Sequence, residues 1–120
     1  MSRAREGAVA DVFFALGDET RISLVRKLCA DGASSATTLS TGEKVTRQAI
    51  VKHLQVLEGA GLVTHEKRGR EVLYLIETRR LDEARLFLDS VSAAWDRAID
   101  RLRIMVEDDE TPPPRKPRSP

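Results

Sequence analysis

Apolar residues at intervals of three and four positions predict two helices near the start of the chain. The first helix ends near Gly17 and carries its apolar face on Val9, Val12, Phe13 and Leu16. Asp18 is a good N-cap for the second helix, because its carboxylate can accept a hydrogen bond from the first helical turn. The inward stripe of the second helix is predicted to be Ile22, Val25, Leu28 and Cys29.

The stretch from residue 32 to residue 61 predicts a loop, a short helix and a longer helix. The sequence "GASSA" is typical of a loop, and the short helix is expected over 37–41 with Leu39 facing inward. Val45 and Thr46 then resemble a hydrophobic staple and an N-cap, and glycines at 59 and 61 end the longer helix. Its inner side is predicted to carry Ala49, Ile50, His53, Leu54 and Leu57. Its outer side is predicted to carry Arg47, Gln48, Val51, Lys52 and Gln55.

The period of the apolar positions changes to two between Leu62 and Ile76. The runs "LVTHE" and "EVLYLI" are rich in β-prone residues and flank the sequence "KRGR". Gly69 can adopt the positive φ that a tight hairpin turn requires. We therefore expect a two-stranded hairpin with a basic tip.

A heptad pattern of apolar residues begins at Leu81. Its members alternate at spacings of three and four: Leu81, Ala84, Leu88, Val91, Trp95, Ala98, Leu102 and Met105. Charges of both signs lie between them, which predicts a long helix whose apolar seam needs a partner helix. The following "EDDETPPPRKPRSP" has no apolar residue to bury, so disorder is expected over 108–120.

Length and composition indicate a single globular domain. The 120 residues are 41% hydrophobic and 32% charged, and only 4% are aromatic, which disfavours a base-stacking surface for single strands. No apolar run is long enough for a membrane span, no signal peptide is evident, and the single cysteine excludes an internal disulfide, so a cytoplasmic protein is expected. No glycine-rich phosphate loop, nucleophile–base pair or metal-ligand spacing predicts an enzyme or a bound cofactor.

The order of elements predicts an α+β winged helix-turn-helix with about five helices and a two-stranded hairpin wing. An α-helix fits the major groove of B-form DNA, where long polar side chains at its start reach base edges. Arg47 is suited to guanine and Gln48 to adenine. Phosphate contacts are expected from Lys52, Lys67, Arg68 and Arg70. The net charge of +1 does not decide the matter, since a local basic patch counts for more than the total.

Three stretches together resemble the ArsR-type winged-helix repressors of bacteria: "FFALGDETRISLVRKL", "VTRQAIVKHLQVLEGAGLV" and "REVLYLI". The resemblance covers roughly residues 9–106. It implies a homodimer that binds an imperfect promoter palindrome and represses until a signal releases it. The DNA-contacting residues that it implies are Thr46, Arg47, Gln48, Lys52, His53, Arg68, Gly69 and Arg70, beside the basic Lys67. The first and last helices usually form the dimer interface, which here implies Val9, Phe13, Leu88, Val91, Trp95, Ala98, Leu102 and Met105.

The sequence departs from the metal-sensing members of that family. The expected third helix has no cysteine pair, and no histidine lies beyond His65, so neither familiar metal site is expected. His53 is either a packed histidine or a phosphate contact. Cys29 is chiefly a small buried side chain, with redox sensing as the alternative. Trp95 either packs in the dimer interface or lies beside a small-molecule site.

The sequence thus predicts three parts. Residues 8–78 form a winged helix-turn-helix DNA-binding domain, residues 79–107 a dimerisation helix, and residues 108–120 a disordered tail. The expected partners are double-stranded DNA, a second copy of the chain, and an unidentified small-molecule or protein effector, with no membrane. The predicted function is sequence-specific transcriptional regulation by a dimeric repressor. The alternatives are a protein-interaction module, or a redox- or metal-gated sensor of the same fold.

Overall fold

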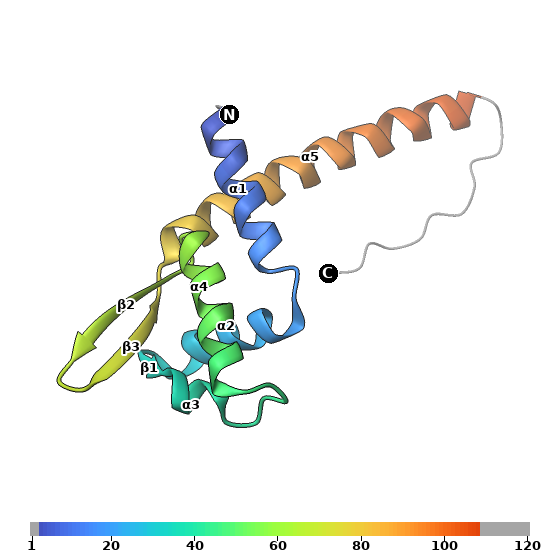
Figure 1. Cartoon of the computed structure of the whole chain (residues 1–120). Coiled ribbons are helices and arrows are strands. Elements are labelled where there is room, and N and C mark those ends of the chain that lie inside the picture. Colours follow the sequence, from blue (N-terminus) through green and yellow to red (C-terminus); the bar gives the residue numbers. More distant parts are fainter. Residues whose placement is uncertain (1–2, 109–120) are drawn as a thin grey trace. The chain divides into compact units, whose positions relative to one another are not determined.

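The computed structural model describes residues 3–108, with side chains from residue 6 onward (Figure 1). Residues 109–120, which hold most of the predicted tail, lie outside this range. Two compact units divide the chain between Arg85 and Leu86. The last helix, α5 (Thr78–Asp108), begins in the first unit and continues through the second. Over residues 3–108, no helix is long and apolar enough to cross a membrane.

The first unit is a winged helix-turn-helix, as the sequence predicts. Its helices before α5 are α1 (Arg3–Ala15), α2 (Glu19–Asp31), α3 (Ala36–Ser40) and α4 (Arg47–Gly59). Its strands are β1 (Ser34–Ser35), β2 (Val63–Arg68) and β3 (Glu71–Ile76). The hairpin formed by β2 and β3 extends away from the helices of this unit as the wing (Figure 1). Gly69 at its tip has a φ of 62°, which confirms the predicted turn.

The sheet has one strand more than the predicted wing. Within residues 3–108 it contains three antiparallel strands in the order β1–β3–β2. Ser34 pairs with Tyr74, and Ser35 pairs with Leu73, so the expected loop "GASSA" is partly strand. The prediction was wrong here because a strand of two residues is too short to show the alternation that identifies strands in a sequence. Its existence depends on the neighbouring β3.

Two helices begin at the predicted capping residues. The Asp18 side chain accepts a hydrogen bond from the backbone N–H of Arg21 at 3.0 Å, at the start of α2. Thr46 Oγ1 accepts one from the backbone N–H of Ala49 at 3.1 Å, at the start of α4. Each bond satisfies an amide that has no partner within its own helix. The cap at Thr46 therefore fixes where the polar outer face of α4 begins.

The core of the first unit holds α4 in place. Its largest fully buried side chains come from α1, α2, α3, α4 and the start of the wing: Val12, Leu24, Leu39, Ile50, Leu54, Leu57, Leu62 and Val63. The predicted inner residues Ile50, Leu54 and Leu57 of α4 are thus confirmed. Because interiors are closely packed, a helix anchored by three buried side chains has a fixed orientation.

Two predictions about helix faces were wrong in part. On α2 the predicted inward residues Leu28 and Val25 are confirmed, because Leu28 is buried and Val25 packs against the core. Ile22 and Cys29 are exposed, and Leu24 is buried instead. The core face of α2 is therefore rotated away from the predicted stripe, and Cys29 is not a small buried side chain. On α4, Val51 is half-buried and packs against the core instead of lying on the outer face. Both helices carry apolar residues on adjacent faces, and the neighbouring elements decide which face is covered.

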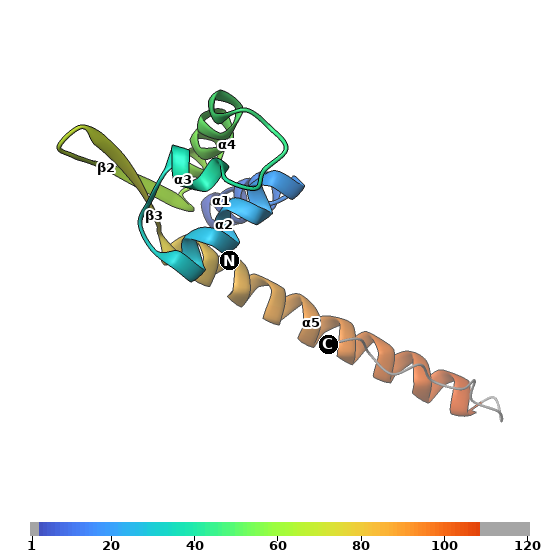
Figure 2. The ribbon, with the colours of Figure 1, turned by 90° about the horizontal axis from the view of Figure 1, so that it is seen from below.

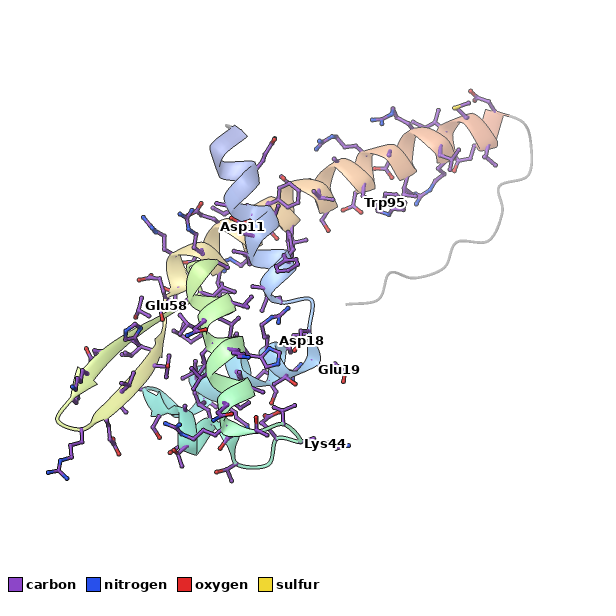
Figure 3. All side chains as sticks on the ribbon, viewed as in Figure 1. Asp11, Asp18, Glu19, Lys44, Glu58 and Trp95 are labelled. Carbon is purple, nitrogen blue, oxygen red and sulfur yellow. The ribbon has the colours of Figure 1, made fainter. Side chains whose placement is uncertain are left out.

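The second unit contains the remainder of α5, from Leu86 onward. None of its described residues is fully buried, although many are apolar. Trp95 is 59% exposed and Leu102 is 56% exposed. Figure 3 shows Trp95 on this part of α5. Among residues 3–108, the predicted seam is covered at Leu81 and Ala84, which pack against the core of the first unit. From Leu88 onward, the described residues leave it largely exposed.

Candidate nucleic-acid interface

The turn between α3 and α4 is fixed by side chains from α2. Lys27 Nζ donates to the backbone carbonyls of Leu39 at 3.0 Å and Thr41 at 2.8 Å, at the end of α3. It also forms an ion pair of 2.7 Å with Glu43, whose carboxylate accepts a second bond from Ser23 Oγ at 2.6 Å. Orphan carbonyls at the end of a helix are thereby satisfied. The two helices of the motif consequently keep one mutual position (Figure 1, Figure 2).

The start of α4 presents a polar surface to solvent. Arg47, Gln48 and Lys52 are exposed there, as is Gln55 one turn further along. Lys44 lies in the turn that leads into α4 (Figure 3). These side chains lie opposite the buried stripe of the helix. The predicted outer face is therefore present, apart from Val51.

Arg47 differs from its neighbours, because it has a partner on α3. Its Nε donates a hydrogen bond to Thr37 Oγ1 at 3.0 Å. The guanidinium is therefore tied back toward the first helix of the motif. Arginine carries five N–H donors, so the terminal nitrogens of Arg47 keep donors for another ligand.

The wing supplies the remaining basic residues of the predicted interface. Lys67, Arg68 and Arg70 are exposed at the end of the hairpin around Gly69. Arg68 pairs with Glu66 at 2.7 Å, and their side chains are 69% and 43% exposed, so the pair contributes about 0–1 kcal/mol. Exchange of this partner for a phosphate therefore costs little.

A groove lies between the helix-turn-helix and the wing. Its lining includes Thr37 and Thr38 from α3, and Arg47 and Val51 from α4. Residues 70–72 and Tyr74 line the opposite side. The groove therefore has cations on both sides, Arg47 on α4 and Arg70 at the wing turn.

His53 lies on the inner side of α4 and contacts α2. Arg21 Nη1 lies 3.1 Å from His53 Nδ1, and the Asp18 carboxylate lies 3.8 Å from the same nitrogen. Because a guanidinium only donates, Nδ1 acts as the acceptor in this contact. Arg21 Nε also donates to the carbonyl of Ala15 at 2.6 Å, at the end of α1. Arg21 thus links α1 to α4, and His53 is engaged inside the unit.

Two carboxylates at these junctions have lowered pKa values. The hydrogen bonds from Lys27 and then Ser23 hold the pKa of Glu43 below its ordinary value of 4.5. The hydrogen bond from the backbone N–H of Arg21 lowers the pKa of Asp18 below 3.8. Both carboxylates are therefore charged near neutral pH, and the contacts that position α4 are formed.

The comparisons with known proteins decide the family. A family model described as a helix-turn-helix domain matches residues 16–66. The solved structure of an ArsR-like transcriptional regulator from Rhodococcus sp. RHA1 is 37% identical, with a TM-score of 0.72 over 83% of this chain and 93% of that one. This chain belongs to the ArsR family of helix-turn-helix transcriptional regulators. The winged helix described above is the DNA-binding fold of that family.

Two relatives known from sequence agree with the ArsR assignment. The HTH-type transcriptional repressor SmtB of Mycobacterium tuberculosis (strain H37Rv) is 34% identical over 92 residues, which are 77% of this chain. The chain spans 66% of the length of that repressor. The uncharacterised HTH-type regulator YuzN of Bacillus subtilis (strain 168) is 41% identical over a match that covers 71% of its length.

His65 and the single cysteine of this ArsR protein, Cys29, lie on different elements. His65 Nδ1 contacts Glu58 Oε1 at 2.7 Å, at the base of the wing (Figure 3), and Cys29 is exposed on α2. Within residues 3–108, no three His, Cys, Asp or Glu side chains form a group that could hold a metal ion.

Sequence reasoning missed the residues that position the interface of this ArsR protein. Lys27 and Glu43 hold the turn before α4, and Thr37 holds Arg47. Lys27 and Glu43 are 16 positions apart in the sequence, and Thr37 and Arg47 are 10 positions apart, so no local spacing reveals either contact. Arg21, at the start of α2, contacts His53 on α4 across 32 positions of the sequence, which no local spacing reveals.

Proposed function

We propose that this ArsR-family protein is a repressor that binds an imperfect palindrome in promoter DNA as a homodimer. The observation that supports the proposal is the exposed polar start of α4, held on a buried core and flanked by a basic wing tip. A helix presented in this way fits the major groove, and basic side chains beside it contact phosphates. Repression is inferred from SmtB, a transcriptional repressor.

The proposed DNA-contacting residues lie at the start of α4 and at the wing tip: Thr46, Arg47, Gln48, Lys52, Lys67, Arg68, Gly69 and Arg70. His53 is left out, because Arg21 already engages its Nδ1. In a dimer, two copies of α4 would lie about one helical turn of DNA, about 34 Å, apart. This separation would match the two halves of a palindrome.

The second copy is inferred from the uncovered apolar face of α5. Its seam in the second unit consists of Leu88, Val91, Trp95, Ala98, Leu102 and Met105. Ile99 and Val106 flank the seam, so the apolar face is wider than a pair of helices needs. We infer that this face packs against two helices: α5 of the second copy and α1. Phe13 of α1 would be part of that interface. Val9 is only 3% exposed within its own chain, so we do not include it in the proposed interface.

The repressor cycle that we propose also needs a signal. A small molecule or a protein effector would lower the affinity for DNA and release the promoter. Because promoter DNA is the proposed ligand, we expect the protein to act in the cytoplasm.

Selection of bound duplexes from random DNA tests the proposed function. We expect a two-fold symmetric consensus whose half-sites lie about 10 base pairs apart, centre to centre. The affinity for that consensus should fall steeply and linearly with log salt, because phosphate contacts release counterions. The absence of a consensus, together with a flat salt dependence, would contradict the proposal and favour a protein-interaction module.

Gln48 and Gln55 provide a matched pair for base recognition. Both are exposed glutamines on nearly the same side of α4, but only Gln48 lies in its first turn. Recognition helices contact base edges with their N-terminal residues. In fluorescence anisotropy, we expect Gln48→Ala to lose about 1–3 kcal/mol of preference for the consensus over a mismatched duplex. Gln55→Ala should keep that preference, and equal losses in both variants would contradict the orientation proposed for α4.

A further inference from the structure

We propose that the groove between the helix-turn-helix and the wing binds one sugar–phosphate strand of the operator, and that Arg47 contacts its phosphates and not a base. The inference rests on the proposed function and deepens it. It changes the role expected for Arg47, because the residue type alone had indicated a contact with guanine. It also gives Thr37, on α3, a part in DNA binding.

The first support is the position of Arg47 on α4. Arg47 and Val51 line the groove that faces the wing, whereas Gln48 and Lys52 do not. Residues four apart share one side of a helix, so Arg47 and Val51 form a line next to the wing. The first turn of α4 therefore presents two separate surfaces. Gln48 belongs to the exposed ridge, and Arg47 belongs to the wall of the groove.

The second support is the hydrogen bond from Arg47 Nε to Thr37 Oγ1. In helix-turn-helix complexes the second helix enters the major groove, and the first helix crosses the DNA backbone. Here the first helix is α3, so a guanidinium held by Thr37 lies on the side where the backbone passes. An arginine that reads guanine must instead extend into the groove to reach two acceptors on the base edge.

The third support is the chemistry of the groove. Arg47 and Arg70 line it together with one carboxylate, Glu71, so its cations outnumber its anions. A hydroxyl can donate and accept at once, so Thr37 keeps a hydrogen for a phosphate oxygen while it accepts from Arg47. Val51 and Val72 supply apolar lining, which suits the deoxyribose between phosphates. Guanidinium, hydroxyl and apolar groups in one groove match a sugar–phosphate strand.

The test compares variants in the same selection from random DNA and in salt titrations on the resulting consensus. Arg47→Ala should select the same consensus as the wild type with lower affinity at every sequence. Its slope of log K against log salt should be smaller by about one, because one phosphate contact is lost. Thr37→Val, which removes the tether but keeps the charge, should weaken binding less, also without a change of consensus.

Two further variants serve as controls. Gln48→Ala should change the preference at one base position and keep the salt slope, since glutamine is neutral. Arg26→Ala removes a charge from the exposed side of α2, outside the groove, and should leave the slope unchanged. Circular dichroism of each variant verifies the fold.

The outcomes separate the two levels of the proposal. A wild type that selects no consensus contradicts the proposed function itself. A normal wild type whose Arg47→Ala variant changes its base preference at one position, or keeps the full salt slope, contradicts only the assignment of Arg47 to the strand in the groove.

Discussion

The two units of this chain treat their apolar residues in opposite ways. In the first unit, Leu54 and its neighbours on α4 are wholly buried among residues from the other helices and the sheet. In the second unit, Leu102 and Trp95 lie on α5 and remain more than half exposed. Leucine side chains such as Leu54 are thus buried within the first unit, whereas the leucines described in the second unit are exposed.

This difference separates two sources of stability. Burial of a leucine side chain contributes about 1.5–3 kcal/mol, whether the covering surface belongs to the same chain or to another. The first unit obtains that contribution on folding, independently of protein concentration. In the proposed dimer, the second unit would obtain it only through association, so its stability would depend on concentration by mass action.

The largest effect is expected from the core of the first unit. Leu54→Ala should lower the free energy of unfolding by about 3–4 kcal/mol, because it removes buried methyl groups and leaves a cavity. Urea denaturation at several protein concentrations measures this loss, which should be the same at each. Leu102→Ala is the matched control, and its loss should grow with concentration. If the loss for Leu102→Ala did not depend on concentration, the second unit would not obtain its stability through association.

A glutamate placed in the apolar seam of the second unit tests whether that seam forms the proposed dimer interface. Leu88→Glu should raise the dimer dissociation constant at least about 100-fold, since a carboxylate would be buried without a partner. Sedimentation velocity measures the shift, and circular dichroism should show the first unit still folded. Leu86→Glu is the control, because Leu86 is 62% exposed and about 200° away around the helix. An unchanged dimer for Leu88→Glu would remove the seam from the proposed interface.

A smaller effect is expected where α4 leads into the wing. Gly61 has a φ of 79°, and a Cβ there would lie 2.8 Å from Arg80 Cγ. Gly61→Ala should therefore destabilise the first unit by about 1–2 kcal/mol in urea denaturation. Gly59→Ala, with no atom within 4 Å of the added Cβ, should be neutral or stabilise by up to about 1 kcal/mol. Equal losses in both variants would rule out backbone strain as the reason.

The smallest effect is expected from the ionic contact before α4. Glu43 has a pKa below 4.5 in the folded protein, so its contribution to stability is full above that pH. It is lost as the pH falls through the lowered pKa. Glu43→Gln should be less stable than the wild type by about 1 kcal/mol at pH 7, and the difference should vanish in acid. Thermal unfolding over a pH series measures it.

Glu107→Gln, on the exposed end of the second unit, provides the control for Glu43. Its stability should stay within about 0.5 kcal/mol of the wild type at every pH. If the difference for Glu43→Gln persisted unchanged in acid, the ionic contact with Lys27 would not be its cause.

The sequence is sufficient for features that depend on neighbouring residues. The caps at Asp18 and Thr46 and the turn at Gly69 were predictable, because each is a local match between a side chain and a backbone geometry. The hairpin followed from its alternating apolar positions. The order of these elements was enough to predict a winged helix-turn-helix.

The sequence is insufficient for features that depend on distant residues. The α2 helix has two overlapping apolar stripes, and only its packing partners select Leu24 over Ile22. Val51 lies at the edge of the buried face of α4, where a small rotation decides its exposure. The tether between Arg47 and Thr37 joins two helices across a turn, and neither residue type indicates it. The exposure of the residues proposed to contact DNA could thus be predicted from the sequence, but their contacts within the protein could not.

The two-residue strand β1 has a consequence for the length of operator that this protein can accept. The α3 helix begins at Ala36, directly after β1, and β1 is hydrogen-bonded to β3, which forms half of the wing. The helix-turn-helix and the wing are thereby joined through paired backbone, in addition to the short segment that leads from α4 into β2. In the proposed complex, an extra base pair between the sites of helix and wing displaces one of them by about 3.4 Å. We therefore expect the pairing of β1 with β3 to make the proposed complex intolerant of insertions within a half-site.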